Sequence, residues 1–339
     1  MTTHVLHAEI LKPKALDPAS WSAIRDCFDR LQEAARTNDR PLVIGSAKDL
    51  VEATARVVLD SRGQPAGSNE EYDKVLNAAH RAIERQPGPG LSADAAVRQA
   101  ANAAKKLAVQ LRELRNSYGT GHGRSTLPPI EDEVIETCVD GALLWTRWAL
   151  RRLQFLIIGS VQQLVTDLHN STFSMGELAI RLQAANLPDL LFEDQRLLGV
   201  AVGQRAATNT FTVRIDGVEA CAVSQDDAAW PVGYREGVAD GLFLDSTGQI
   251  RVDTNVFGPR LTAQLLVPHP RQVEVLRGLA DKIRSAAWST EFRGLWRRVV
   301  EEMHAADAFF QQEGAKGSWL DIAEHIKATG KKYEAAAGA

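Results

Sequence analysis

One short stretch of the chain holds two side chains whose types and spacing suit the cleavage of RNA. Arg115 and His122 have six residues between them, and the run from Leu114 to Arg124 reads LRNSYGTGHGR, so a helical pattern gives way to glycines between the two. An arginine can hold a phosphate through paired hydrogen bonds and can neutralise the charge that builds as phosphorus becomes five-coordinate. A histidine, whose ordinary pKa is about 6.5, can take a proton from the ribose 2′-hydroxyl or give one to the leaving oxygen at neutral pH.

Together the two groups suffice for attack by the 2′-hydroxyl on its own neighbouring phosphodiester. Such a reaction needs no metal ion and no cofactor, and it leaves a 2′,3′-cyclic phosphate. DNA is excluded as a substrate because it lacks the nucleophile. An arginine and a histidine at this spacing also occur by chance, and the alternative interpretation of His122 is a surface histidine near a helix end.

The sequence around this pair resembles a known family. Residues 114–124 resemble the HEPN superfamily, and within it the abortive-infection C-terminal (Abi-C) family, whose members carry Arg-Asn and then a glycine-flanked His-Gly at the end of a helix. Residues 44–54, IGSAKDLVEAT, resemble that family's helix-opening segment and stand in the right order. The resemblance covers residues 19–159 and does not extend to the C-terminal half.

The resemblance implies roles for the residues of this motif. It implies that Arg115 contacts phosphate, that His122 is the acid and base, and that Asn116 positions the scissile nucleotide or the turn. It also implies a homodimer, because HEPN ribonucleases usually assemble their cleft from two copies of the motif facing one another.

Two acidic residues upstream also match positions of the family. The resemblance implies that Asp49 and Glu52, one turn apart on the preceding helix, help to orient the motif's arginine. Simpler interpretations exist for both, since Asp49 could be a cap partner of Ser46 and a single glutamate on a helix is usually solvated.

Basic residues surround the motif in a chain whose net charge is −4. Six lysines or arginines stand between positions 98 and 124 against one acidic residue, which would attract a polyphosphate backbone locally. The alternative is a solvated helix face. Tyr118 could stack on a base or pack the helix end. The candidate RNA-binding cations are Lys105, Lys106, Arg112 and Arg124.

Apolar residues at helical spacing and capping residues predict the elements that position this motif. The first helix follows Asp17-Pro18, and the second opens with a cap at Ser46 to Asp49 and stops at Gly63. A capping box at 68–71 predicts the third. Long helices over 92–118 and 131–158 complete a bundle of four or five helices.

The second half shows a different pattern. Short strands are predicted at 197–202, 210–215, 242–244 and 250–252, with a hairpin turn at 246–249. A short helix capped by Ser174 and Glu177 is predicted, and further helices are predicted over 270–286, 290–311 and 318–328. We therefore expect a mainly α chain: an N-terminal extension (1–16), an HEPN-like helical domain (17–165), and a smaller C-terminal α+β domain (166–339) of unknown role.

These observations favour one function and leave alternatives. Three scattered cysteines and the lack of a long apolar run indicate a cytoplasmic protein without a membrane span. We expect a metal-independent endoribonuclease of the abortive-infection or toxin type, with RNA, a second copy, and a neutralising antitoxin or phage-derived trigger as partners. One alternative is a non-catalytic HEPN dimer that serves as an RNA- or protein-binding scaffold or sensor in phage defence. A second, weaker alternative is an independent enzyme in the C-terminal half, because no nucleophile with a nearby base is recognisable in the sequence of that half.

Overall fold

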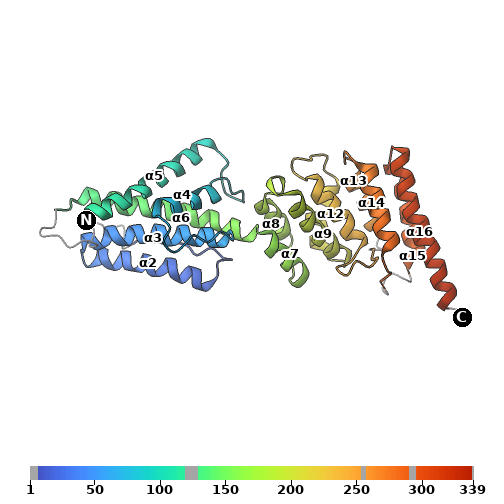
Figure 1. Ribbon diagram of the computed structural model, residues 1–339, viewed down its shortest axis with the longest axis horizontal. Coiled ribbons are helices and arrows are strands. Elements are labelled where there is room, and N and C mark those ends of the chain that lie inside the picture. The colour runs from blue at the N-terminus through green and yellow to red at the C-terminus, as the bar shows by residue number, and fades with distance from the viewer. Residues whose placement is uncertain (1–6, 119–128, 253–256, 290–294, 338–339) are drawn as a thin grey trace. The chain divides into compact units, whose positions relative to one another are not determined.

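The chain divides into two compact units, Met1–Ser160 and Val161–Ala339 (Figure 1). The computed structural model describes residues 7–118, 129–252, 257–289 and 295–337. Each unit has apolar cores of its own. No helix within the described ranges combines the length and the apolar character that a membrane crossing needs.

The first unit is a helical bundle, as predicted. Helix α3 packs against each of the other four described helices of the unit, so it lies at the centre of the bundle. The helices are α2 (Pro18–Arg36), α3 (Arg40–Ser61), α4 (Tyr72–Ile83), α5 (Ala95–Tyr118) and α6 (Asp132–Ile158).

Local capping explains where these helices begin, and two predicted caps are wrong. Asp17 caps α2 as expected, accepting the Ser20 N–H at 2.9 Å. Helix α3 does not open at Ser46, which is buried inside the helix, because Asp39 supplies a cap more than a turn earlier with a proline just behind it. The predicted capping box at 68–71 does not form, since Glu71 precedes α4 without a side-chain cap bond.

Helix α5 is held in the bundle by a face of mostly small side chains and by polar contacts with α4. Its buried face consists of Ala101, Ala104, Ala108 and Leu111. The Tyr72 hydroxyl of α4 donates to the Ala108 carbonyl at 2.7 Å. Asn102 of α5 contacts His80 of α4 at 3.1 Å, and His80 in turn accepts from Trp145 of α6. These contacts fix the register of α5 against its neighbours.

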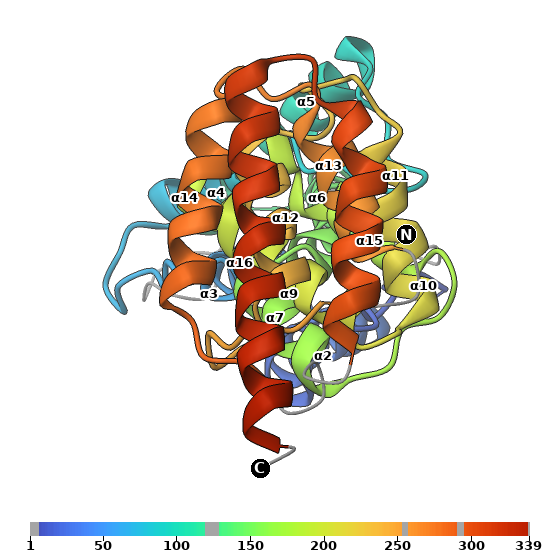
Figure 2. The ribbon, with the colours of Figure 1, turned by 90° about the vertical axis from the view of Figure 1, so that its right-hand side faces the viewer.

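The second unit is also helical. Its longer helices are α7 (Val161–Asn170), α8 (Glu177–Ala185), α9 (Phe192–Ala207), α12 (Val232–Phe243), α13 (Gly258–Leu266), α14 (Gln272–Ser285), α15 (Trp296–Ala306) and α16 (Glu313–Ala337). Between α9 and α12 a π-helical segment, η2 (Arg214–Glu219), joins two single turns, α10 (Phe211–Val213) and α11 (Ala220–Ala222). Helices α14 and α15 flank α16 (Figure 2).

The predicted C-terminal α+β domain is wrong, because the described part of this unit holds no strand. Residues 197–202 lie in α9, residues 211–215 lie in α10 and η2 directly after the cap residue Thr210, and α12 ends at Phe243 with Leu244 as its cap residue. Helices α9 and α12 are buried against each other, and their glycines bring the backbones into contact. A Cβ on Gly241 would lie 2.2 Å from the Val200 carbonyl oxygen. Because both helices are buried on several sides, their sequences lack the polar positions that normally separate apolar residues at spacings of three and four, the pattern by which a helix is recognised.

Of the predicted hairpin, the structure contains the turn at 246–249 but not the two strands. Gly248 has a φ of +77°, and the Asp245 N–H donates to the Gln249 carbonyl at 2.9 Å. Residues 250–252 do not form a strand, although Ile250 makes single bridges to Leu244 and to Trp288.

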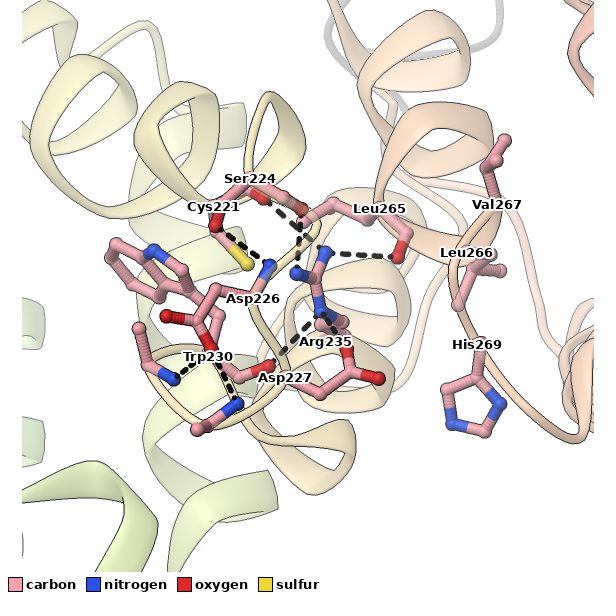
Figure 3. A network of polar contacts seen from close by, with 12 residues as sticks. Cys221, Ser224, Asp226, Asp227, Trp230, Arg235, Leu265, Leu266, Val267 and His269 are labelled. Atoms are coloured by element: carbon pink, nitrogen blue, oxygen red, sulfur yellow. Dashed lines mark hydrogen bonds and ion pairs between the residues drawn. The ribbon is translucent and has the colours of Figure 1, made fainter.

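One buried arginine ties the helices of this unit together (Figure 3). The Arg235 side chain is fully buried on α12. It donates to four backbone carbonyls, those of Trp230, Cys221, Ser224 and Leu265. A charge removed from water requires such partners, so Arg235 serves the architecture of the unit.

Candidate functional site

Arg115 lies in the last turn of α5 and continues the buried face of that helix. Positions 101, 104, 108, 111 and 115 follow one another at spacings of three and four, so their side chains share one side of the helix. The Arg115 side chain is half-buried. It forms no hydrogen bond or ion pair with any residue that the structure describes. Within the described residues, therefore, Arg115 is a cation on the bundle side of a helix end without an ionic partner.

Two predicted site residues, His122 and Arg124, lie outside the described residues. Helix α5 ends at Tyr118, so the arginine of the motif is helical and lies three residues before the end of that helix. The pairing of Arg115 with His122 therefore stays a prediction.

The two predicted residues next to Arg115 face different surroundings. Asn116 is exposed. Tyr118 is half-buried and packs against the apolar core of the first unit. Of the two interpretations of Tyr118, packing of the helix end is what the structure shows, and stacking on a base stays a prediction.

The three predicted RNA-binding cations that lie on α5, Lys105, Lys106 and Arg112, do not share one side of that helix. Lys106 and Arg115 are nine residues apart, which places them about 180° apart around the helix axis, and Lys106 is exposed on the outer side. Lys105 and Arg112 share the edge next to α4, where Arg112 forms an ion pair with Asp73 at 2.6 Å. The basic residues near the motif are therefore divided between an inner edge and an outer face.

The predicted acidic partners of Arg115 belong to a different network. The two carboxylate oxygens of Glu52 contact Lys48 at 2.5 Å and Arg56 at 2.9 Å. Burial works to raise the pKa of Glu52, but the hydrogen bonds from these two cations outweigh it and hold the pKa below its usual value. Asp49 is exposed, 3.9 Å from the Lys48 ammonium. Because both oxygens of Glu52 are occupied, we leave it out of the site.

This network is a structural feature that the sequence analysis missed. Lys48, Glu52 and Arg56 stand at spacings of four on α3, a pattern that could have predicted a ladder of ion pairs. The Lys48 ammonium also lies 4.8 Å from the centre of the Tyr72 ring on α4. The ladder thus joins α3 to the helix that holds α5.

Comparison with known proteins identifies the first unit. A family model described as an HEPN-like domain (Abi_C) matches residues 22–146. Residues 22–146 are an HEPN-like domain. The predicted resemblance is confirmed, and Arg115 and His122 both lie inside the matched range of the HEPN-like domain. No significant match was found among curated proteins or among solved structures.

Proposed function

We propose that the HEPN-like domain is a metal-independent endoribonuclease of the abortive-infection type. The observation that carries this proposal is the position of Arg115, half-buried in the last turn of α5 within the matched range 22–146. A guanidinium without an ion-pair partner in the described part of the chain suits a phosphate that arrives as a ligand.

The chemistry follows from the two side chains. The ribose 2′-oxygen attacks the adjacent phosphorus while His122 accepts its proton, and the bond from phosphorus to the 5′-oxygen breaks. A protonated His122 of the second copy in the proposed homodimer can return a proton to that leaving oxygen. Arg115 stabilises the charge on the five-coordinate phosphorus, and Asn116 positions the scissile nucleotide.

The positions of the cations around α5 support a ranking of the predicted RNA-binding residues. Lys105 and Arg112 lie on the edge of α5 that is nearer to Arg115, whereas Lys106 lies on the outer face. Asp73 neutralises part of the Arg112 charge through a 2.6 Å contact. We therefore assign phosphate binding beyond the scissile link to Lys105 first.

The remaining parts of the proposal concern partners. A ribonuclease that is toxic to its own cell must be held inactive, and the second unit is the part of the chain available for such control. We propose RNA and a second copy as partners, with a neutralising antitoxin or a phage-derived trigger acting on the complex in the cytoplasm.

The test is cleavage of RNA by the full chain in the presence of EDTA. The wild type should leave 2′,3′-cyclic phosphate ends, and a substrate with deoxyribose at the scissile nucleotide should stay intact. Arg115→Ala and His122→Ala should each abolish cleavage, while Arg36→Ala and His304→Ala, which remove exposed side chains of the same types, should cleave normally.

Two results would contradict this mechanism. Cleavage that requires an added metal ion would exclude the proposed chemistry. Undiminished cleavage by the double variant of Arg115 and His122 would exclude these residues. Absence of any cleavage together with retained RNA binding would favour the non-catalytic scaffold instead.

A further inference from the structure

The second unit carries an open groove of about 530 Å³ along one side of α9. Its lining on α9 extends from Glu193 to Gln204, which is about 16 Å at a rise of about 1.5 Å per residue. Leu244 and Gly248 line the far end, where the Gln204 amide donates to the Leu244 carbonyl at 3.3 Å. The groove is therefore about as long as three turns of a helix.

One buried carboxylate fixes the walls of this groove. Asp240 of α12 is 8% exposed, and it accepts from Arg196 of α9 at 2.6 Å. Its two oxygens also accept from the Lys282 ammonium of α14 at 2.8 and 2.7 Å. These contacts tie three helices together, and Asp240 offsets part of the charge of the two cations. Walls that are held before a ligand arrives lose less conformational entropy on binding.

The floor of the groove is apolar. Leu197, Val200 and Leu244 line it, and 44% of Leu197 is exposed to water. Two further exposed apolar residues, Leu191 and Phe192, stand at the start of the same helix. Exposed apolar side chains that gather on one surface and are rimmed by charged groups mark interaction sites, because they gain free energy when a partner covers them.

The end of the groove at the start of α9 is acidic. Glu193 and Asp194 line it, and neither forms an ion pair with any residue that the structure describes. The surrounding chain is acidic as well, since residues 161–252 contain twelve aspartates or glutamates, six arginines and no lysine. Such a surface repels a phosphate backbone and attracts lysines and arginines.

We propose that this groove binds an amphipathic helix of a partner protein, with lysines or arginines beside the acidic end and large apolar side chains over the floor. Side chains three and four residues apart on such a helix lie on one face, so they would cover Leu197, Val200 and Leu244 together. A wholly apolar helix would leave Glu193 and Asp194 without partners beneath it. The groove lies in the second unit, so this proposal does not rest on the proposed nuclease activity.

Fluorescence anisotropy with labelled synthetic peptides and the full chain tests the proposal. The probe is an amphipathic helix of about 14 residues, with leucines three and four apart on one face and lysines on the other. This lysine peptide should bind saturably. A peptide with glutamate in place of every lysine, and one of the same composition in scrambled order, should each bind about tenfold more weakly or worse, which corresponds to about 1.4 kcal/mol or more.

Two variants of the groove should change the affinity in different ways. The double variant Glu193→Lys with Asp194→Lys should bind the lysine peptide about tenfold more weakly or worse and the glutamate peptide more tightly than the wild type does. A misfolded chain could not produce that gain. Leu197→Asn should weaken the binding of the lysine peptide, because it removes an apolar contact from the floor.

Each variant has a matched control in the same unit. Glu301→Lys with Glu313→Lys makes the same charge change at exposed positions that do not line the groove. Leu295→Asn removes a leucine that is 43% exposed, against 44% for Leu197, and that also lies outside the groove. Both controls should bind the lysine peptide like the wild type.

The proposal is overturned by absence of saturable binding, by equal affinity for the scrambled peptide, or by unchanged affinity in Leu197→Asn. Weaker binding of single-stranded RNA to Leu197→Asn would assign the groove to nucleic acid. Self-association of the wild type that Leu197→Asn abolishes would assign the groove to a second copy of the chain. Either of these two results would also overturn the proposal.

Discussion

The Nε1–H of Trp145 donates a hydrogen bond to Nδ1 of His80 at 3.3 Å inside the HEPN-like domain. Because Nδ1 accepts, the ring proton lies on Nε2, which faces the Asn102 side-chain oxygen at 3.1 Å. The ring also stacks on Trp148, with ring centres 4.8 Å apart. His80 is therefore a neutral structural histidine that joins α4, α5 and α6, in contrast to the proton-transfer role proposed for His122.

The stability of the first unit should decrease as the pH falls, because His80 must be neutral in the folded state. Burial, and then the nearby Lys105 charge, lower the pKa of His80 below its ordinary value of 6.5. The unfolded chain thus takes up a proton first as the pH falls, so the contribution of neutral His80 is complete above about pH 6.5 and is lost progressively below it. Urea unfolding of the wild type and of His80→Gln from pH 8 to pH 5 measures this. The variant should be less stable at pH 8 and less sensitive to pH, and equal pH slopes would contradict the assignment.

Loss of the buried Arg235 side chain should unfold or strongly weaken the second unit. Arg235→Ala leaves four backbone carbonyls without their donor, and we expect a loss of about 3–5 kcal/mol. Arg235→Lys keeps the charge but cannot supply five N–H donors in a planar group, so it should rescue only part of the loss. Chemical denaturation measures both. Arg271→Ala is the control, since 58% of that side chain is exposed and its change should be within about 0.5 kcal/mol.

Adding a methyl group should have opposite effects at two helical glycines. The Cβ of Gly241→Ala would meet the Val200 carbonyl at 2.2 Å, so α9 and α12 must separate, at a cost of about 1–3 kcal/mol. Around Gly278 of α14 there is open space, so Gly278→Ala should stabilise by about 0.5–1 kcal/mol through helix propensity. Thermal unfolding monitored by circular dichroism compares the two. A neutral or stabilising Gly241→Ala would show that the helix pair is not in backbone contact.

The two neighbouring lysines of α5 should differ in their effect on RNA binding. Lys105 lies on the edge nearer to Arg115 and Lys106 on the outer face, so Lys105→Glu should weaken binding to single-stranded RNA more than Lys106→Glu. Lys105→Glu should also reduce the dependence of the affinity on salt, by about one phosphate contact. Fluorescence anisotropy over a salt series, with Arg115→Ala to prevent cleavage, measures this. A larger effect at Lys106 would place RNA on the outer face of α5.

Helices buried on one face, and the residues of the motif, could be predicted from the sequence. Asp17-Pro18 and the three-four spacing of apolar residues predicted α2, and the same kind of pattern predicted α5 and α6. These predictions succeeded because a helix with one face in water keeps polar residues at regular positions between the apolar ones. Arg115 was thereby placed correctly at the end of a helix, inside the matched HEPN-like range. The cap of α3 was misplaced because Asp39 and Ser46 both offer capping side chains, and only the packed helix shows which is buried.

The sequence by itself thus determined that Arg115 stands at the end of α5 and which helices bury only one face. Tertiary structure alone decided the rest. Residues 197–202 of α9 and 242–244 at the end of α12 were predicted as strands because packing on several sides removes the polar positions that mark a helix. The backbone contact of these two helices depends on glycines from two distant segments. Glu52 pairs with Lys48 and Arg56 because the three stand at spacings of four on one helix, which is a local pattern, whereas tertiary structure decided that this ladder and Arg115 belong to separate networks.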